Sequence, residues 1–172
     1  MPIVVITTIV ILMAGGIQAE IKQRKPFAGL EQEVYRALLR TADALSRPAE
    51  ALFKEHGISP TQYNALRILR GAGKQGLACS EVGERMITRD PDLTRLLDRL
   101  ERRKLVERRR DRQDRRVILT RITPQGLEIL KSLDRPIEDL HRRLLSHMGQ
   151  ARLRSLLQLL EKAREELRCE FV

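Results

Sequence analysis

The chain has 172 residues, a length that suits one compact core, or one core with long helices that pack against a second copy. Its 33 Lys and Arg against 23 Asp and Glu leave a formal net charge of +10, which favours a polyanionic partner. Aromatic residues make up only 3% and Trp is absent, which argues against proteins that stack single-stranded bases on aromatic platforms and favours duplex DNA.

The first 25 residues form an apolar extension. Within it, Met1–Met13 is nearly all apolar, but it is shorter than the roughly 20 residues of a membrane-spanning helix. A secretory signal would require a Lys or Arg before this apolar stretch, and the sequence has none there. We therefore expect Met13 to be the natural start, in preference to a membrane anchor, and we expect no membrane partner.

Two helices are expected next. Apolar residues recur at helical spacing over residues 30–56, where Pro48 introduces a kink and Gly57 ends the helix. The run Ser59-Pro60-Thr61-Gln62 then offers a capping hydroxyl, a proline at the first helical position and a Gln that completes a capping box. The second helix stops at residues 71–73.

Two shorter helices follow, over residues 79–86 and 91–103. Asp90 can accept hydrogen bonds from free backbone N–H groups at the start of the latter, and Pro91 has no N–H to satisfy. Helical spacing divides this helix into an inward apolar face and an outward polar, basic face. The inward residues are Leu93, Leu96, Leu97 and Leu100, and the outward ones are Thr94, Arg95, Asp98 and Arg99.

Over residues 105–122 the spacing of the apolar residues becomes shorter than that of a helix, which predicts a β-hairpin with its turn at Asp111 to Asp114. Thr123-Pro124 then begins a long helix that ends at Gly149 and is kinked at Pro136. In the last helix, residues 150–169, apolar residues alternate three and four apart, as in a coiled-coil seam. They are Leu153, Leu156, Leu160, Ala163 and Leu167.

Two short helices followed by a charged hairpin predict a mainly α (α+β) winged helix-turn-helix domain, whose second helix enters the major groove. Between Arg89 and Arg116 there are twelve Lys or Arg and seven Asp or Glu, a local charge of +5. The charges alone would also fit a solvated hairpin, but their position beside a recognition-type helix favours DNA. We expect DNA contacts from Arg89, Asp92, Thr94, Arg95, Arg99, Arg108, Arg110, Arg112, Arg115 and Arg116.

The run from Leu93 to Gly126 resembles the signature of the MarR (multiple antibiotic resistance regulator) family of winged-helix repressors, and the resemblance covers roughly residues 28–170. It is carried by Leu93, Arg95, Leu100, Glu101, Leu105, Val106, Asp114, Arg115, Arg116, Thr123 and Gly126. Lys104 departs from the family pattern, which has Gly where the backbone leaves the helix in a left-handed conformation. Asp92 also departs, because it replaces a small polar residue beside the DNA.

The resemblance implies a homodimeric regulator, in most cases a repressor, that binds a pseudo-palindromic operator and is released by a small-molecule effector. It implies a DNA-binding region at residues 58–123 and a dimerisation region at 28–57 and 124–172. Asp114 is interpreted as fixing the wing, and Phe53 and Tyr63 are candidates for the effector pocket. The expected dimerisation residues are Val34, Leu38, Leu153, Leu156, Leu160 and Leu167.

Other functions find less support in the residues. We detect no phosphate-cradling loop, nucleophile elbow or metal triad, so we expect neither an enzyme nor a cofactor or metal. A sequence-tolerant architectural DNA-binding protein remains the main alternative, and a redox-sensing regulator acting through Cys79 is another. The two cysteines have neither metal-ligand spacing nor the density of a secreted disulfide scaffold, which predicts a cytoplasmic protein.

Overall fold

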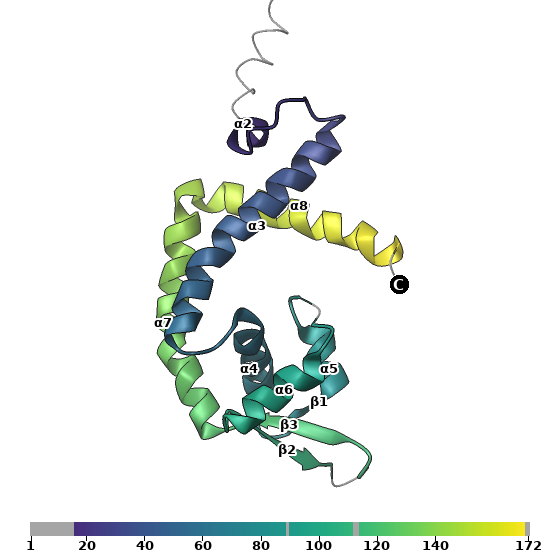
Figure 1. The fold of residues 1–172 in the computed structure, drawn as a ribbon, viewed down its shortest axis with the longest axis vertical. Helices are drawn as coiled ribbons and strands as arrows, with labels where there is room; N and C mark the ends of the chain where they lie inside the picture. Colours follow the sequence, from purple (N-terminus) through teal and green to yellow (C-terminus); the bar gives the residue numbers. More distant parts are fainter. Residues whose placement is uncertain (1–15, 89, 112–113, 171–172) are drawn as a thin grey trace, which may run out of the picture. The chain divides into compact units, whose positions relative to one another are not determined.

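Figure 1 shows the fold, a computed structural model that describes residues 16–88, 90–111 and 114–170, with the backbone alone for residues 166–170. The chain divides into two compact units, residues 1–47 and 48–172, and α3 (Leu30–Glu55) contributes to both. None of the helices in the described part of the chain combines the length and the apolar character needed to cross a membrane.

The first unit contains α2 (Ile17–Glu20), a single turn, and the first part of α3. Glu20 is joined to Arg40 of α3 by an ion pair of 2.7 Å. The apolar face that the sequence predicts on α3 is open to solvent here, since Leu30 is 70% and Val34 47% exposed. The Met1–Met13 stretch, and the expected start at Met13, lie outside the described residues.

In the second unit, α4 (Pro60–Ala72) begins at the predicted cap. The Ser59 hydroxyl accepts a hydrogen bond from the Gln62 N–H at 3.2 Å, and the Gln62 side chain accepts one from the Ser59 N–H at 3.0 Å. These reciprocal bonds satisfy two backbone N–H groups that the helix itself leaves without partners. The predicted capping box is confirmed.

Next come α5 (Cys79–Arg85) and α6 (Leu93–Arg102), the helix-turn-helix pair. We expected α6 to begin at Pro91, but it begins two residues later. Asp90 Oδ1 accepts a hydrogen bond from the Asp92 N–H at 2.9 Å, which forms a turn instead of capping the helix. A short polar side chain that bonds two residues ahead competes with helix formation, which explains the difference.

Three antiparallel strands form a sheet in the order β1-β3-β2. The hairpin strands β2 (Val106–Arg110) and β3 (Ile118–Ile122) lie within the predicted segment, and Val106 pairs with Ile122. β1 (Leu77–Ala78) was not predicted, because two residues carry no readable alternation. β1 pairs with the edge of β3 that does not pair with β2, and α5 follows β1 directly in the chain.

Between α6 and β2 the chain makes a Schellman turn. The Lys104 N–H donates to the Glu101 carbonyl at 2.8 Å, and the Leu105 N–H donates to the Leu100 carbonyl at 3.0 Å. Lys104 has a φ of +59°, the left-handed conformation that the family resemblance implied at this position. A residue with a Cβ is strained there by about 1–2 kcal/mol.

The chain then forms α7 (Pro124–Leu145) and α8 (Gly149–Glu170). Thr123 Oγ1 accepts from the Gly126 N–H at 3.1 Å, which confirms the predicted cap of α7. α7 ends at Leu145, short of the predicted Gly149, because Ser146–Met148 tightens into a 3-10 turn, η1. Gly149, at a φ of +74°, then begins α8.

One apolar core holds the second unit together, drawn from α4, α5, α6, the strands and α7. Its most deeply buried side chains are Leu66, Leu69, Val82, Leu96, Leu97, Leu100, Leu105, Val106, Leu130 and Leu133. In Figure 1 the hairpin extends from this core beside α6. The predicted fold class, a mainly helical winged helix-turn-helix protein, is confirmed.

Lys104→Gly is expected to raise the free energy of unfolding by about 1 kcal/mol, because Gly adopts the left-handed conformation without steric strain. Lys104 is exposed, so the substitution removes no buried contact. Urea denaturation at a fixed protein concentration measures the change. Lys104→Ala is the matched control: it keeps a Cβ and should gain little, and an equal gain from both variants would contradict the strain.

Candidate DNA-binding surface

The helix α6 has two contrasting faces. Leu96, Leu97 and Leu100 are at most 1% exposed and pack into the core of the second unit. The helical repeat places Thr94, Arg95 and Arg99 on the opposite side, where all three are exposed. The surface of α6 therefore presents one hydroxyl and two guanidinium groups, which are suited to the edges of bases in a major groove.

Asp92 lies just before α6 and contacts one of these arginines. Its Oδ2 lies 3.1 Å from Nη1 of Arg95, although the Arg95 side chain is 78% exposed. The pair leaves the start of the polar face open to solvent. The acid that departs from the family pattern is thus beside a cation, which offsets its repulsion of DNA phosphates.

Arg108 lies differently from the other arginines of the predicted DNA-binding set. Its side chain is only 21% exposed and points from β2 onto α6. There its guanidinium lies 2.6 Å from Asp98 Oδ1, 3.7 Å from Glu101 Oε2 and 3.2 Å from the Thr94 carbonyl oxygen. These partners occupy the guanidinium, so its geometry is that of a link between hairpin and helix.

The hairpin turn is shaped by carboxylates. Asp114 Oδ1 accepts a hydrogen bond from the Arg116 N–H at 2.9 Å, and Asp111 Oδ1 accepts one from the Asp114 N–H at 2.9 Å. The Val117 N–H also donates to the Asp114 carbonyl at 2.9 Å. These bonds hold the turn that carries Arg115 and Arg116, both of which are exposed.

Three further arginines of the predicted set remain to be placed. Arg110, at the end of β2, is exposed and pairs with Ile118 of β3. Arg89 and Arg112 lie outside the described residues. The described cations of the hairpin that face solvent thus gather at its distal half, away from the core.

Sequence reasoning missed one contact that holds the helix-turn-helix together. Asn64, on α4, accepts a hydrogen bond from the Ile87 N–H at 2.9 Å and so anchors the turn between α5 and α6. The two residues are far apart in the chain and neither belongs to a motif, so no sequence signal identifies the pair. Cys79, at the start of α5, contacts the exposed face of α6, with its Sγ 4.0 Å from Thr94 Oγ1.

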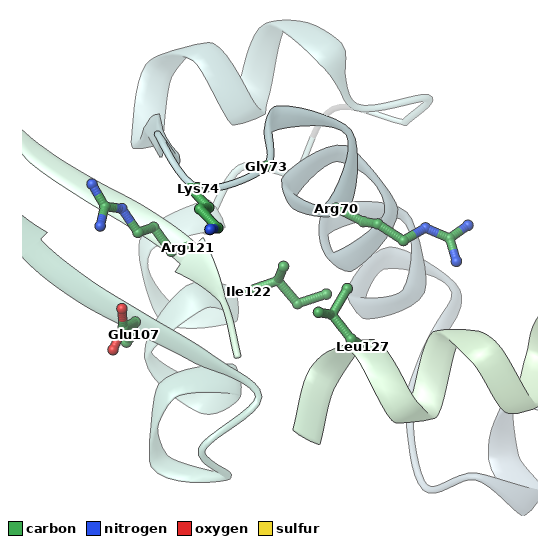
Figure 2. Close-up of a pocket in the computed structure, with 7 residues that line it drawn as sticks. All are labelled: Arg70, Gly73, Lys74, Glu107, Arg121, Ile122 and Leu127. Carbon is green, nitrogen blue, oxygen red and sulfur yellow. The ribbon is translucent and has the colours of Figure 1, made fainter. Parts of the chain in front are cut away.

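Phe53 and Tyr63, the candidates for an effector pocket, lie in the core. Phe53 is 5% and Tyr63 8% exposed, and their rings stack with centroids 4.3 Å apart. Burial raises the pKa of the Tyr63 phenol. Two cavities of the second unit, one of which is shown in Figure 2, are lined by other side chains, and an effector site at the Phe53–Tyr63 pair stays a prediction.

Comparison with known proteins agrees with this geometry. A sequence model of the MarR family matches residues 56–117. An uncharacterized HTH-type transcriptional regulator of Bacillus subtilis, YkoM, is 30% identical over 131 residues, which cover 76% of this chain and 83% of that protein.

Solved structures give the same result. The crystal structure of a MarR transcription factor from Planctomyces limnophilus is 39% identical, with a TM-score of 0.60, over 79% of this chain and 98% of that one. A crystal structure of the MepR–DNA complex from S. aureus has a TM-score of 0.70 at 22% identity, over 77% of this chain and 97% of that one. The latter likeness concerns the fold alone.

A double-mutant cycle of Asp98→Ala and Arg108→Ala is expected to give a coupling energy of about 1–2 kcal/mol in urea denaturation, because the pair is partly shielded from water. Glu138 and Arg142, an i,i+4 pair at 2.9 Å with side chains 70% and 63% exposed, serve as the control. Exposed helical pairs contribute about 0.3–0.5 kcal/mol. Equal coupling in the two pairs would show that Arg108 does not tie the hairpin to α6.

Proposed function

The chain belongs to the MarR family of helix-turn-helix transcriptional regulators, and on this basis we propose that it binds a pseudo-palindromic operator in a sequence-specific manner as a homodimer. The observation that carries the proposal is the exposed face of α6, with Thr94, Arg95 and Arg99 opposite a buried row of leucines. A gene repressor works by occupying such an operator, and repression is the mode that we propose. The protein would act in the cytoplasm, where its DNA lies.

Base reading is assigned to α6. An Arg guanidinium can donate two hydrogen bonds to O6 and N7 of guanine, the commonest specific contact in a major groove. Arg95 is the better candidate, because its ion pair with Asp92 at 3.1 Å limits the orientations of an otherwise exposed side chain. Thr94 and Arg99 complete the set, and Asp92 can accept from the amino group of a cytosine.

Phosphate and minor-groove contacts are assigned to the distal half of the hairpin. Arg110, Arg115 and Arg116 are exposed there, and a guanidinium is attracted by the negative potential of a narrow minor groove. Arg108 receives another role: its contacts with Asp98 and Glu101 hold the hairpin at a fixed angle to α6. Contacts from Arg89 and Arg112 stay predictions.

Dimerisation is assigned to the helices near the two ends of the chain. On α3, Val34 is 47% and Leu38 42% exposed. On α8, Leu157 and Leu159 are 54% and 67% exposed, and the predicted seam residues Leu153, Leu156 and Leu160 are half-buried. Apolar faces of this extent favour a second copy, and a two-fold dimer places two recognition helices about 34 Å apart, one turn of DNA. The Leu167 side chain lies outside the described residues.

Arg95→Ala is expected to relax base preference at one position of each half-site, since it removes a groove contact at a cost of about 1–3 kcal/mol. Arg115→Ala is expected to weaken binding to all duplexes alike and to reduce the slope of log affinity against log salt by about 1. Selection of bound sites from random DNA, followed by titration at several salt concentrations, measures both effects.

The same selection tests the proposal as a whole. A regulator of this kind should enrich a short inverted repeat and bind it at least about a thousand times more tightly than unrelated DNA. Recovery of random sequences with no enrichment would identify a sequence-tolerant architectural protein instead. If Arg95→Ala and Arg115→Ala each lowered the affinity for all duplexes equally, the assignment of base contacts to α6 and phosphate contacts to the hairpin would be contradicted.

Leu156→Glu is expected to shift the protein from dimer to monomer in analytical ultracentrifugation, because it places a charge in the apolar seam of α8. Gln158→Glu is the matched control, since it adds the same charge at an exposed position of the same helix. The control should remain dimeric. A Leu156→Glu variant that is still a dimer would place the interface elsewhere.

A further inference from the structure

The carboxylate of Asp92 lies at the start of α6, where an acidic side chain usually caps the helix. Asp92 is the N-cap residue, the position from which a side-chain oxygen accepts a hydrogen bond from a backbone N–H of the first turn. The Asp92 side chain makes no such bond. Its Oδ2 lies instead 3.1 Å from Nη1 of Arg95, three residues further along the chain. The carboxylate thus contacts the exposed face of α6 and not the end of its backbone.

Backbone hydrogen bonds fix the position of Asp92 from both sides. The Asp92 N–H donates to Asp90 Oδ1 at 2.9 Å, and the Asp92 carbonyl oxygen accepts from the Leu96 N–H at 3.0 Å. Leu96 is fully buried in the core of the second unit. The place of the Asp92 carboxylate is therefore set by the buried face of the same helix.

The ion pair between Asp92 and Arg95 contributes little to folding. The Arg95 side chain is 78% and the Asp92 side chain 45% exposed, and water screens the attraction between groups as open as these. An acid on a surface that meets DNA also repels phosphates, which lowers the affinity for any duplex. The pair weakens binding without a matching gain in stability, which indicates a role in how Arg95 binds.

One edge of the Arg95 guanidinium stays open in this arrangement. Nη1 is the atom paired with Asp92, whereas Nε and Nη2 lie side by side on another edge of the planar group. Neither of these two atoms has a hydrogen-bond partner among the residues that the structure describes. Two parallel N–H groups match O6 and N7 of guanine, so the open edge suits a guanine.

The neighbouring carboxylate also changes which acceptor Arg95 prefers. A phosphate carries a full negative charge, which Asp92 repels, whereas O6 and N7 of guanine are uncharged acceptors. The formal charges of Asp92 and Arg95 cancel, so the pair gains less from a phosphate than a lone arginine does. Its two free N–H groups still bond fully to a base.

We propose that Asp92 determines specificity: it keeps Arg95 from phosphates and orients it toward a guanine, so the protein loses affinity for unrelated DNA and gains discrimination between bases. The inference rests on the proposed function, because it concerns the selectivity of the same helix. Asp92 acts through Arg95 and is a positioning residue. The small polar residue that it replaces carries no charge, so the effect depends on this departure from the family pattern.

Asp92→Asn tests the proposal, because it removes the charge and keeps the size of the side chain. Asp90→Asn is the matched control: it removes the same charge two residues away and keeps an oxygen that can accept from the Asp92 N–H. Both variants should bind unrelated duplex DNA more tightly than the wild type. Asp92→Asn also frees Arg95 for a phosphate, so its slope of log affinity against log salt should be steeper by about 1, while Asp90→Asn keeps the wild-type slope.

Base discrimination is the second measurement. The guanine of the selected operator at which Arg95→Ala loses its preference is replaced by adenine, and the ratio of the two affinities is measured for each variant. Asp92→Asn should lower this ratio by at least about threefold, since a neutral partner holds the guanidinium about half as strongly, and Asp90→Asn should leave it unchanged. In an Arg95→Ala background, Asp92→Asn and Asp90→Asn should give the same slope and the same ratio.

Two further measurements separate this role from others. Asp92→Ser, which lacks the charge and can cap the helix, should repeat both effects of Asp92→Asn, and urea denaturation should show each variant as stable as the wild type. Equal slopes or equal ratios for Asp92→Asn and Asp90→Asn would overturn the proposal. A wild-type protein without operator preference would refute the proposed function, whereas the slopes on unrelated DNA would still show whether Asp92 keeps Arg95 from phosphates.

Discussion

The burial of one face of α6 is the constraint on which the candidate DNA-binding surface depends. Leu96, Leu97 and Leu100 lie in the core, and helical geometry then leaves a single orientation for the opposite face. Base contacts need a rigid helix, because a donor that moves by an ångström loses its acceptor. The apolar residues of α6 thus determine where its polar residues can act.

The positive charge of the protein is divided between structure and surface. Arg108 forms ion pairs with Asp98 and Glu101, and Arg70 forms one with Asp134. The exposed cations on α6 and at the distal hairpin are the ones proposed to meet phosphates and bases, and of these Arg95 is paired with Asp92. A count of arginines therefore overstates the number of cations available to DNA, and the DNA contacts themselves stay a prediction.

One turn joins the recognition helix to the C-terminal helices. The Thr123 hydroxyl donates to the Lys104 carbonyl at 2.7 Å, and the Thr123 N–H donates to the Leu105 carbonyl at 3.0 Å. Gly126 lies so close to the Leu105 carbonyl that a side chain at Gly126 would collide with it. The exit of α6 and the start of α7 are therefore in direct contact, and the cavity beside Leu127 lies next to this junction.

The sequence by itself determined the helices from α3 onward, the hairpin and the capping box at Ser59, because each follows from local spacing or local backbone chemistry. The left-handed turn at Lys104 was expected from the family resemblance, and the short helix α2 was not predicted. Only the tertiary structure decided that Arg108 faces inward, that Asn64 anchors the turn before α6, and that β1 exists. It also brought Lys74 and Arg121 to one cavity. These contacts join residues distant in the chain, and a periodic pattern carries no information about which distant residue a side chain will meet.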